Sequence, residues 1–244
     1  STPFDERSAE ELADYVPAWK VASYTSSHIP FLKHLAGTDK PIIMSTGAHK
    51  LEEVSESVAA LRDTGVSDLV VLQCVAAYPT PISEINVHVI ETLQNEFDVF
   101  TGLSDHTLDP ITAPTAAVAL GASVVEKHFT LDNSMEGPDH QFALEPDELH
   151  QMISAIRDTE KALGSGEKRV LDIEQELYEK ARRAIHAVRD IEVGDVISDE
   201  DIQVLRPGEK EGGLDPKFYN EIIGKTAVRN IEEGYGIKWD DIRE

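Results

Sequence analysis

The sequence is poor in cysteine, in basic residues and in long apolar runs, and each shortage excludes a class of protein. Its 244 residues contain one cysteine, Cys74, so an intrachain disulfide is impossible. No apolar run reaches the length of about 18 residues that indicates a transmembrane helix. Residues 1–5 lack the basic-then-apolar pattern of a secretory signal. We therefore expect a cytoplasmic protein in a reducing compartment.

Basic residues are outnumbered by acidic ones, 22 to 46, which gives a formal net charge of −24. Such a charge repels nucleic acid and anionic membranes. Because the acidic residues are spread along the chain and do not form one tail, they indicate a solvated acidic surface. Our hypothesis is a halophilic source, with an ordinary acidic mesophilic protein as the alternative. An anionic substrate would need lysine or arginine gathered locally to overcome this field.

Apolar runs alternate with helical patterns over the first two-thirds of the chain. Expected strands cover residues 19–23, 41–47, 69–74, 99–106 and 123–128, and expected helices cover 30–36, 50–64, 82–95, 108–122 and 146–163. The strands are apolar without alternation, as in parallel sheets covered on both faces. About five βα units stand against the eight of a closed (β/α)₈ barrel. This predicts either an open doubly wound sheet or a barrel without its first strands.

The pattern changes after Gly164-Ser165-Gly166. A charged helix over 174–183 is followed by short strands and turns, with strands expected at 187–191 and 226–231. The phrases RDIEVGDVISDEDI (189–202) and RNIEEGYGIKWDDI (229–242) form a weak internal repeat of strand, glycine turn, short strand and acidic helix start. We assign residues 1–165 to the first domain, 166–180 to a linker helix region and 181–244 to a small β-rich domain.

Two histidines near carboxylates, His106 and His128, each close a short apolar strand. The strand–helix–strand unit that contains them predicts parallel strands, so both imidazoles should lie at the same carboxyl edge. Two neutral imidazoles converging there could hold a divalent cation. The alternative is that each histidine satisfies a hydrogen bond at a strand end.

Several short motifs occur in one order along the chain. They are Lys20-Val21-Ala22-Ser23, Ser45-Thr46-Gly47, Tyr78-Pro79-Thr80, Gly102-Leu103-Ser104-Asp105-His106-Thr107, Glu126-Lys127-His128-Phe129 and Gly137-Pro138-Asp139-His140. This series resembles the sialic acid synthase family, which includes N-acetylneuraminate, legionaminate and pseudaminate synthases. Leu205-Arg206-Pro207-Gly208 and Ile223-Gly224-Lys225 are similar to that family's antifreeze-like (SAF) domain. The resemblance covers essentially the whole chain.

The resemblance implies an α/β fold: a partial (β/α)₈ TIM barrel, roughly the fourth to eighth strands, followed by a SAF domain. It implies a C–C bond-forming transferase that condenses phosphoenolpyruvate with an N-acylated amino sugar, such as N-acetylmannosamine, to a nonulosonic acid and phosphate. It also implies a divalent metal, Mn²⁺ or Mg²⁺, held by His106 and His128. Such a metal would polarise the sugar carbonyl.

The same resemblance assigns substrate-binding residues. Those matching the phosphoenolpyruvate site are Thr2, Lys20, Ser23, Ser45, Thr46, Gly47 and Ser104. Tyr78 and Asp139 match contacts to the amino sugar. Arg206 matches an arginine that reaches over a neighbouring subunit's barrel, which implies a swapped homodimer. Without the other motifs, ordinary turn chemistry or a solvated surface charge would explain most of these residues.

The chain departs from the family pattern in two respects. The first barrel strands, with a glutamate base and a Lys-x-Gln pair, are not in it, so no catalytic base is assigned. Ala76 stands where some members have a polar residue. We therefore expect little activity from these 244 residues alone. The alternatives are a non-catalytic carbohydrate-binding or degenerate synthase module, and an aldolase or sugar-acid dehydratase. The sequence selects neither the amino sugar nor Mn²⁺ over Mg²⁺.

Overall fold

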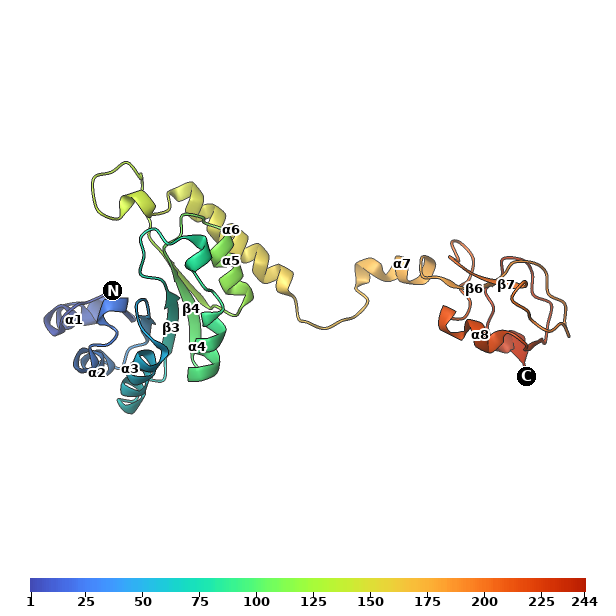
Figure 1. The fold of residues 1–244 in the computed structure, drawn as a ribbon, viewed down its shortest axis with the longest axis horizontal. Helices are drawn as coiled ribbons and strands as arrows, with labels where there is room; N and C mark the ends of the chain where they lie inside the picture. Colours follow the sequence, from blue (N-terminus) through green and yellow to red (C-terminus); the bar gives the residue numbers. More distant parts are fainter. The chain divides into compact units, whose positions relative to one another are not determined.

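A parallel sheet of five strands organises the first part of the chain (Figure 1). The computed structural model describes residues 1–244, which divide into a first unit, 1–166, and a second unit, 167–244. In the first unit the strands lie in sequence order. They are β1 (Trp19–Val21), β2 (Ile42–Ser45), β3 (Leu69–Cys74), β4 (Phe100–Asp105) and β5 (Val124–Lys127). All five carboxyl ends therefore meet at one edge.

Six helices complete the half-barrel. They are α1 (Glu6–Leu12), α2 (Ile29–Ala36), α3 (Leu51–Asp63), α4 (Val89–Phe97), α5 (Thr112–Ala119) and α6 (Pro146–Leu163). Of these, α2 to α5 connect successive strands, α1 precedes β1 and α6 follows β5. The sheet is open, because β1 and β5 each pair with one strand only. Beside β1, the amide of Lys20 donates to the carbonyl of Ser1 at 2.8 Å. None of the helices is both long enough and apolar enough to span a membrane.

The core of the first unit lies between the sheet and its helices. Trp19, Phe31, Leu35, Ile42 and Leu61 are almost fully buried there, and they come from β1, α2, β2 and α3. Burying each such side chain contributes about 1.5–3 kcal/mol. This packing holds one face of the strands against the helices, and it leaves residues on the other face, such as the lysine of β1, for a cavity.

Two expected helices are shorter in the structure. The one over 82–95 is wrong in its first half: a 3₁₀ turn at Ile82–Glu84 comes first, and α4 begins at Val89. Asn86 has φ +46°, a left-handed conformation that ends the first turn. The helix over 108–122 contracts to α5, because the Asp109 carboxylate accepts from the amides of Ile111 and Thr112 and so fixes its start.

The second unit is built from short antiparallel pairs. After the 3₁₀ turn Asp172–Glu174 and α7 (Gln175–Lys180), β6 (Ala184–Ala187) pairs with β7 (Ile202–Leu205). Following α8 (Tyr219–Ile222), β8 (Thr226–Ala227) pairs with β9 (Ile242–Arg243). Its core consists largely of isoleucines. The strand expected over 187–191 is wrong, because the strand ends at Ala187 and a turn follows.

The internal repeat is visible in the hydrogen bonds of the second unit. Ile191 and Ile231 exchange both backbone bonds at 2.8 Å. The amide of Gly194 donates to Ala227, and that of Gly234 donates to Ala187, both at 2.8 Å. The two phrases therefore form equivalent halves that hold each other. The expected acidic helix start is a 3₁₀ turn, Trp239–Asp241, in the second half and a plain turn in the first.

Candidate active site

A cavity of about 310 Å³ opens at the carboxyl ends of the strands. It brings together eight of the residues that the sequence analysis selects: Thr2, Lys20, Ser23, Ser45, Tyr78, Ser104, His106 and His128. Ala22, Cys74, Glu126 and Lys127 complete its lining. Since these residues come from every strand end and from the loops that follow, the half-barrel itself assembles the site.

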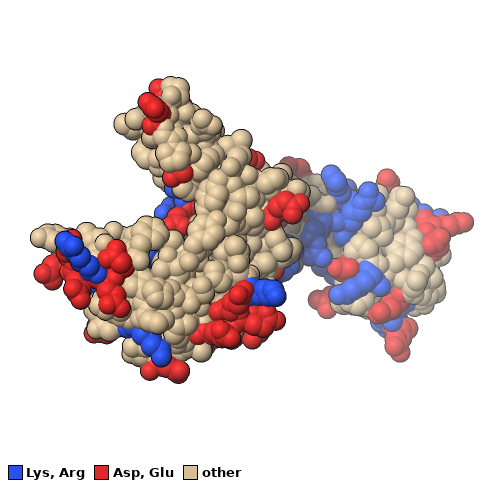
Figure 2. Space-filling view, turned by 60° about the vertical axis from the view of Figure 1, so that its left-hand side comes forward, with Lys and Arg blue, Asp and Glu red and all other residues tan.

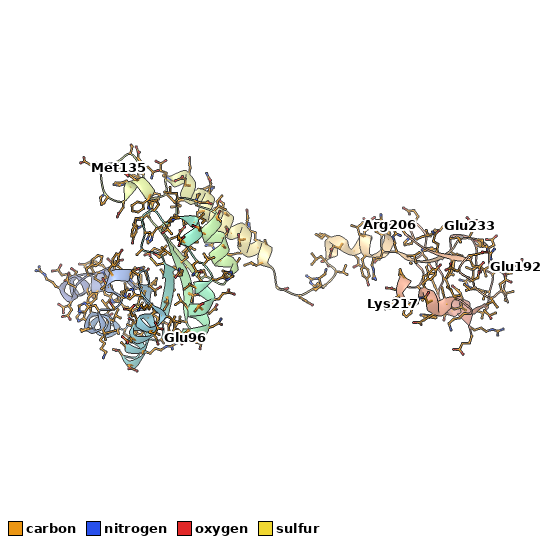
Figure 3. The ribbon with its side chains drawn as sticks, viewed as in Figure 1. Glu96, Met135, Glu192, Arg206, Lys217 and Glu233 are labelled. Atoms are coloured by element: carbon orange, nitrogen blue, oxygen red, sulfur yellow. The ribbon has the colours of Figure 1, made fainter.

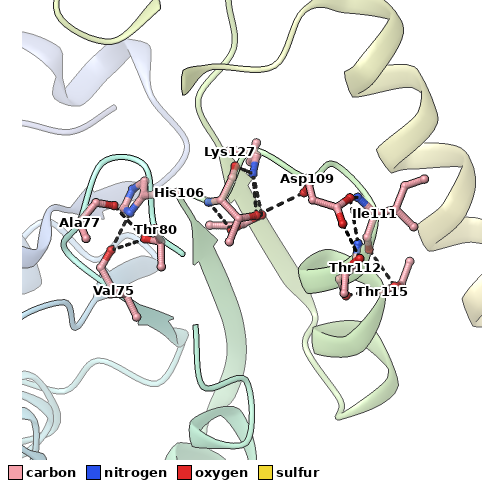
Figure 4. Close-up of polar contacts among 11 residues, drawn as sticks. Val75, Ala77, Thr80, His106, Asp109, Ile111, Thr112, Thr115 and Lys127 are labelled. Atoms are coloured by element: carbon pink, nitrogen blue, oxygen red, sulfur yellow. Dashed lines mark hydrogen bonds and ion pairs between the residues drawn. The ribbon is translucent and has the colours of Figure 1, made fainter. Parts of the chain in front are cut away.

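His106 follows β4 directly and is held by the loop after β3. Its Nδ1 lies 2.9 Å from the carbonyl oxygen of Val75, and its own carbonyl accepts from the amide of Thr80 at 2.9 Å (Figure 4). A carbonyl can only accept, so Nδ1 carries the proton of the neutral ring and the lone pair of Nε2 is free. Histidines that bind metals usually donate their other ring N–H to a carbonyl or carboxylate in this way.

His128 follows β5 and lies beside His106, with the ring centroids 5.3 Å apart. The carboxylate of Asp139 is 3.9 Å from its Nδ1. Burial lowers the pKa of His128, and the charge of His106 lowers it further, while Asp139 opposes both. The neutral, metal-binding form of His128 is therefore favoured over the imidazolium.

The spacing of these rings is compatible with one shared cation. A ring nitrogen about 2.1 Å from an ion places the ring centroid about 3.3 Å from that ion. If the two centroids subtend an angle of roughly 90–110° at the ion, they lie about 4.7–5.4 Å apart. The observed 5.3 Å falls within that range. No group of three or more His, Cys, Asp and Glu residues could hold a metal. A cation at this point would therefore have two imidazoles as its protein ligands.

Aromatic rings form one wall of the histidine pair. The ring of Tyr78 lies 4.2 Å from His106 and 6.0 Å from His128 between centroids. Phe142 lies 5.1 Å from His128 and 5.5 Å from Tyr78. These contacts restrict rotation of both imidazoles and give the cavity an apolar side.

A lysine and two hydroxyls form the opposite side of the cavity around Glu126. The ammonium of Lys20, whose side chain is 15% exposed, lies 3.5 Å from one carboxylate oxygen of Glu126. Ser104 donates to the other oxygen at 2.6 Å and Ser45 at 3.4 Å. Burial lowers the pKa of Lys20, and Glu126 opposes that shift. One cation with convergent hydroxyls is a suitable set of donors for a phosphate or carboxylate.

Two selected residues, Thr46 and Gly47, lie under the cavity and do not line it. Thr46 donates its hydroxyl to the carbonyl of Leu72 at 2.8 Å, and the amide of Gly47 donates to Ser23 Oγ at 2.9 Å. A Cβ on Gly47 would lie 2.9 Å from both Ser23 Oγ and Cys74 Sγ. The turn after β2 therefore positions Ser23, and glycine is needed for that close approach.

The remaining selected residues lie away from the cavity lining. Asp139 has a side chain 63% exposed and reaches the site only through His128. Arg206 belongs to the second unit, in the segment after β7 (Figure 3). Glu126 is the residue that the sequence analysis missed. It precedes His128 by two positions on β5 and so shares its face, a period-two signal that could have identified it.

The cavity contains a lysine although the unit around it is strongly acidic. Residues 1–166 contain 26 acidic and 9 basic side chains, and most of the charged groups on the visible face of this unit in Figure 2 are acidic. Two of the nine, Lys20 and Lys127, are among the residues at the cavity, but the ammonium of Lys127 is buried against Asp105. Lys20 is therefore the cation that an anionic substrate would meet there.

Comparisons with known proteins place the chain in a family. The NeuB family profile matches residues 1–168, and the SAF domain profile matches residues 182–243. The spore coat polysaccharide biosynthesis protein SpsE of Bacillus subtilis is 42% identical over 99% of this chain and 69% of its own length. Its crystal structure covers 100% of this chain and 73% of that one, with a TM-score of 0.64.

Two enzymes are similarly close. A pseudaminic acid synthase of Campylobacter jejuni is 39% identical over 100% of this chain and 70% of its own length. An N,N'-diacetyllegionaminic acid synthase of Legionella pneumophila is 39% identical over 99% of this chain and 68% of its own. With a family profile over most of its length and relatives of this identity, the chain belongs to the NeuB family.

Proposed function

We propose that this protein condenses phosphoenolpyruvate with an N-acylated amino sugar to give a nonulosonic acid and phosphate. The observation that carries the proposal is the two-sided cavity, with Lys20, Ser45 and Ser104 on one side and His106 and His128 on the other. The names of the pseudaminic and legionaminic acid synthases among its relatives support the same class of product.

The anion-binding side would hold phosphoenolpyruvate. Lys20 supplies a charge-assisted donor, and the hydroxyls of Ser45 and Ser104 converge on the same point, now occupied by the Glu126 carboxylate. A phosphate or carboxylate in this position would share those donors. Ser23, fixed by Gly47, and Thr2 extend this side of the cavity.

The histidine side would hold a divalent cation, Mn²⁺ or Mg²⁺, through His106 and His128. When bound, such an ion supplies Lewis-acid polarisation of the sugar carbonyl. His106 contributes its Nε2, because Val75 fixes its tautomer. Tyr78 and Phe142 exclude water from one side of the pair, and Asp139 at the rim is suited to accept hydrogen bonds from sugar hydroxyls.

Glu126 is the one carboxylate that lines the cavity, and we assign it proton transfer. Condensation consumes a water molecule at C2 of the former phosphoenolpyruvate before phosphate leaves, so a group must take a proton from that water. Glu126 lies on the lysine side of the cavity, hydrogen-bonded to Ser104 and beside Lys20. A carboxylate in this place would act as general base if the attacking water lies within hydrogen-bond reach of it.

The test is phosphate release from phosphoenolpyruvate at high protein concentration with a panel of N-acyl amino sugars, with and without EDTA. We expect sugar-dependent release that EDTA suppresses and that Glu126→Gln reduces about a hundredfold or more. Because the sheet is open at β1 and β5, we expect the 244-residue chain to turn over slowly. Binding of phosphoenolpyruvate without any release would favour a non-catalytic module.

We also propose a homodimer in which Arg206 of one subunit completes the sugar site of the other. Arg206 is exposed, and no acidic partner neutralises it, so its guanidinium is available for an acyl or carboxyl oxygen. Sedimentation analysis and the KM of Arg206→Ala test this. A monomeric chain whose KM for sugar is unchanged by the substitution contradicts it.

A further inference from the structure

A buried ion pair joins the two residues that directly precede the histidines. Asp105 precedes His106, Lys127 precedes His128, and alternate residues of a strand point to opposite faces. The Lys127 ammonium is 2.7 Å from Asp105 Oδ2, and these side chains are 3% and 0% exposed. The proposed reaction uses neither of these side chains, although each adjoins a proposed metal ligand.

Thr107 closes this pair into a network. Lys127 Nζ donates to the Thr107 carbonyl and lies 3.4 Å from its hydroxyl (Figure 4). The Thr107 amide donates to Asp105 Oδ1 at 2.8 Å, and its hydroxyl donates to Oδ2 at 3.1 Å. The lysine, the carboxylate and the segment after β4 are thus tied together by five contacts around His106.

The network lies at the end of the β4–β5 ladder, where Asp105 and Lys127 are the last paired positions. No named strand pairs with β5 on its other side, where the carbonyl of His128 accepts from the amide of Leu144 at 2.9 Å. The direction in which His128 leaves β5 is therefore set by the contacts with β4 on one side and by Leu144 on the other. A buried pair of this kind can often be replaced by apolar residues at little cost in stability, so stability alone does not account for it.

We propose that Asp105, Lys127 and Thr107 form a positioning network that sets the separation and orientation of the His106 and His128 imidazoles for one divalent cation. The inference rests on the metal site of the proposed function. None of the three residues contacts the ion or the substrate through its side chain, and each acts through the histidine beside it.

The test measures Co²⁺ binding to the full chain by calorimetry and by visible absorption, which reports the geometry of the ligands. The double variant Asp105→Leu/Lys127→Met keeps an apolar filling and removes both charges. We expect it to bind Co²⁺ at least about tenfold more weakly, with an altered absorption band. Thr107→Val should weaken binding about threefold, and Thr107→Ser should restore it. The control Asp158→Leu/Lys161→Met removes an exposed pair of α6, with both side chains 76% exposed, and should change nothing.

The outcomes separate this inference from the metal site itself. If the unaltered chain fails to bind Co²⁺, or binds it equally well after His106→Ala, the metal site is wrong. If binding requires His106 but the folded double variant keeps the original affinity and spectrum, the positioning network is wrong. Should the double variant fail to fold by circular dichroism, Thr107→Val decides, and an unchanged affinity and spectrum would overturn the inference.

Discussion

The two units bury their polar side chains in different patterns. In the first unit many of them gather at one edge of the sheet, where Ser23, Ser45, Ser104, Asp105, His106 and Thr107 are all buried. In the second unit the buried carboxylates are Asp201 and Asp241, which occupy equivalent positions of the repeat. Each accepts from the arginine and the turn amide of its own half. Because the repeat duplicates the buried aspartates of the second unit, we infer that they stabilise the fold. The polar cluster of the first unit has no such counterpart, and we infer that it marks a functional site.

The largest effect that we expect is loss of metal binding, which should follow from substitutions of histidines in the first unit. His106→Ala or His128→Ala leaves one imidazole, and we expect affinity for Mn²⁺ or Co²⁺ to fall about a hundredfold or more. Titration calorimetry measures this. The control is His88→Ala, whose side chain is 79% exposed at the start of α4. Equal losses of metal affinity in all three variants would mean that binding is nonspecific. The polar cluster at the sheet edge would then not mark a metal site.

A second effect should be confined to the stability of the first unit. In Gly102→Ala the new Cβ would lie 2.3 Å from the carbonyl oxygen of Val124 and 2.6 Å from Leu72 Cδ2, so β4 and β5 must separate. We expect a loss of about 3 kcal/mol in the free energy of unfolding. Gly37→Ala is the control, because its φ is −64° and its nearest contact is 3.4 Å, and we expect a change of about 0.5 kcal/mol or less.

Urea unfolding followed by Trp19 fluorescence gives a reading specific to the first unit. The chain has two tryptophans, and Trp239 belongs to the second unit. In a Trp239→Phe background, the remaining buried indole reports on β1 alone. A Gly102→Ala variant with the same midpoint as its parent would contradict the tight β4–β5 contact.

Much of the first unit could be predicted from the sequence, because long apolar runs and helical stripes are strong local signals. The strand ends at His106 and His128 were predicted to within one residue, and the structure brings the two rings together as expected. The sequence did not show which partners the residues of one motif have. Alternation along a strand predicts that Glu126 and Lys127 point to opposite faces, but only the structure shows that Glu126 accepts from Ser104 and that Lys127 pairs with Asp105.

The second unit was harder to predict because its strands are only two to four residues long. A strand of that length carries too little pattern to fix its bounds, so the expected strand over 187–191 missed its position. The repeat was the more reliable signal, since Arg189 and Arg229 each bond an aspartate twelve residues later. The place of Arg206 relative to a sugar rests on resemblance alone.

A smaller effect on stability is expected from the two arginine–aspartate pairs of the second unit, Arg189–Asp201 and Arg229–Asp241. Asp241→Asn removes the charge that accepts from the Lys238 amide and from Arg229, and we expect a loss of about 2 kcal/mol. Arg229→Ala should cost less than Asp241→Asn, because the arginine side chain is 49% exposed and solvent screens its charge. Thermal melting by calorimetry measures both. A larger loss from the arginine than from the aspartate would show that we have assigned the energy to the wrong partner.

The equivalent carboxylate of the first half predicts a dependence on pH. Burial raises the pKa of Asp201, but hydrogen bonds from Ser198 and Arg189 outweigh it, so the pKa is lowered overall. A carboxyl whose folded pKa is below its unfolded value of about 4 stabilises the fold above that pH and loses this contribution as pH falls further. Asp201→Asn should therefore flatten the acid side of the stability curve, measured by urea unfolding from pH 5 downward. A curve parallel to that of the unaltered chain would contradict this.

The smallest expected effect concerns the difference in charge between the units. The first unit carries 26 acidic and 9 basic residues, a net −17, and the second 20 and 13, a net −7. Because salt screens repulsion among exposed charges, molar KCl should raise the melting temperature of the first unit by a few degrees, roughly 3–6 °C, and that of the second by less. Fluorescence melting in the Trp239→Phe background follows the first unit, and circular dichroism follows both. An equal rise in both units, or no rise, would mean that the acidic surface is not a salt adaptation. A larger rise in the second unit would contradict our assignment of the stronger charge repulsion to the first unit.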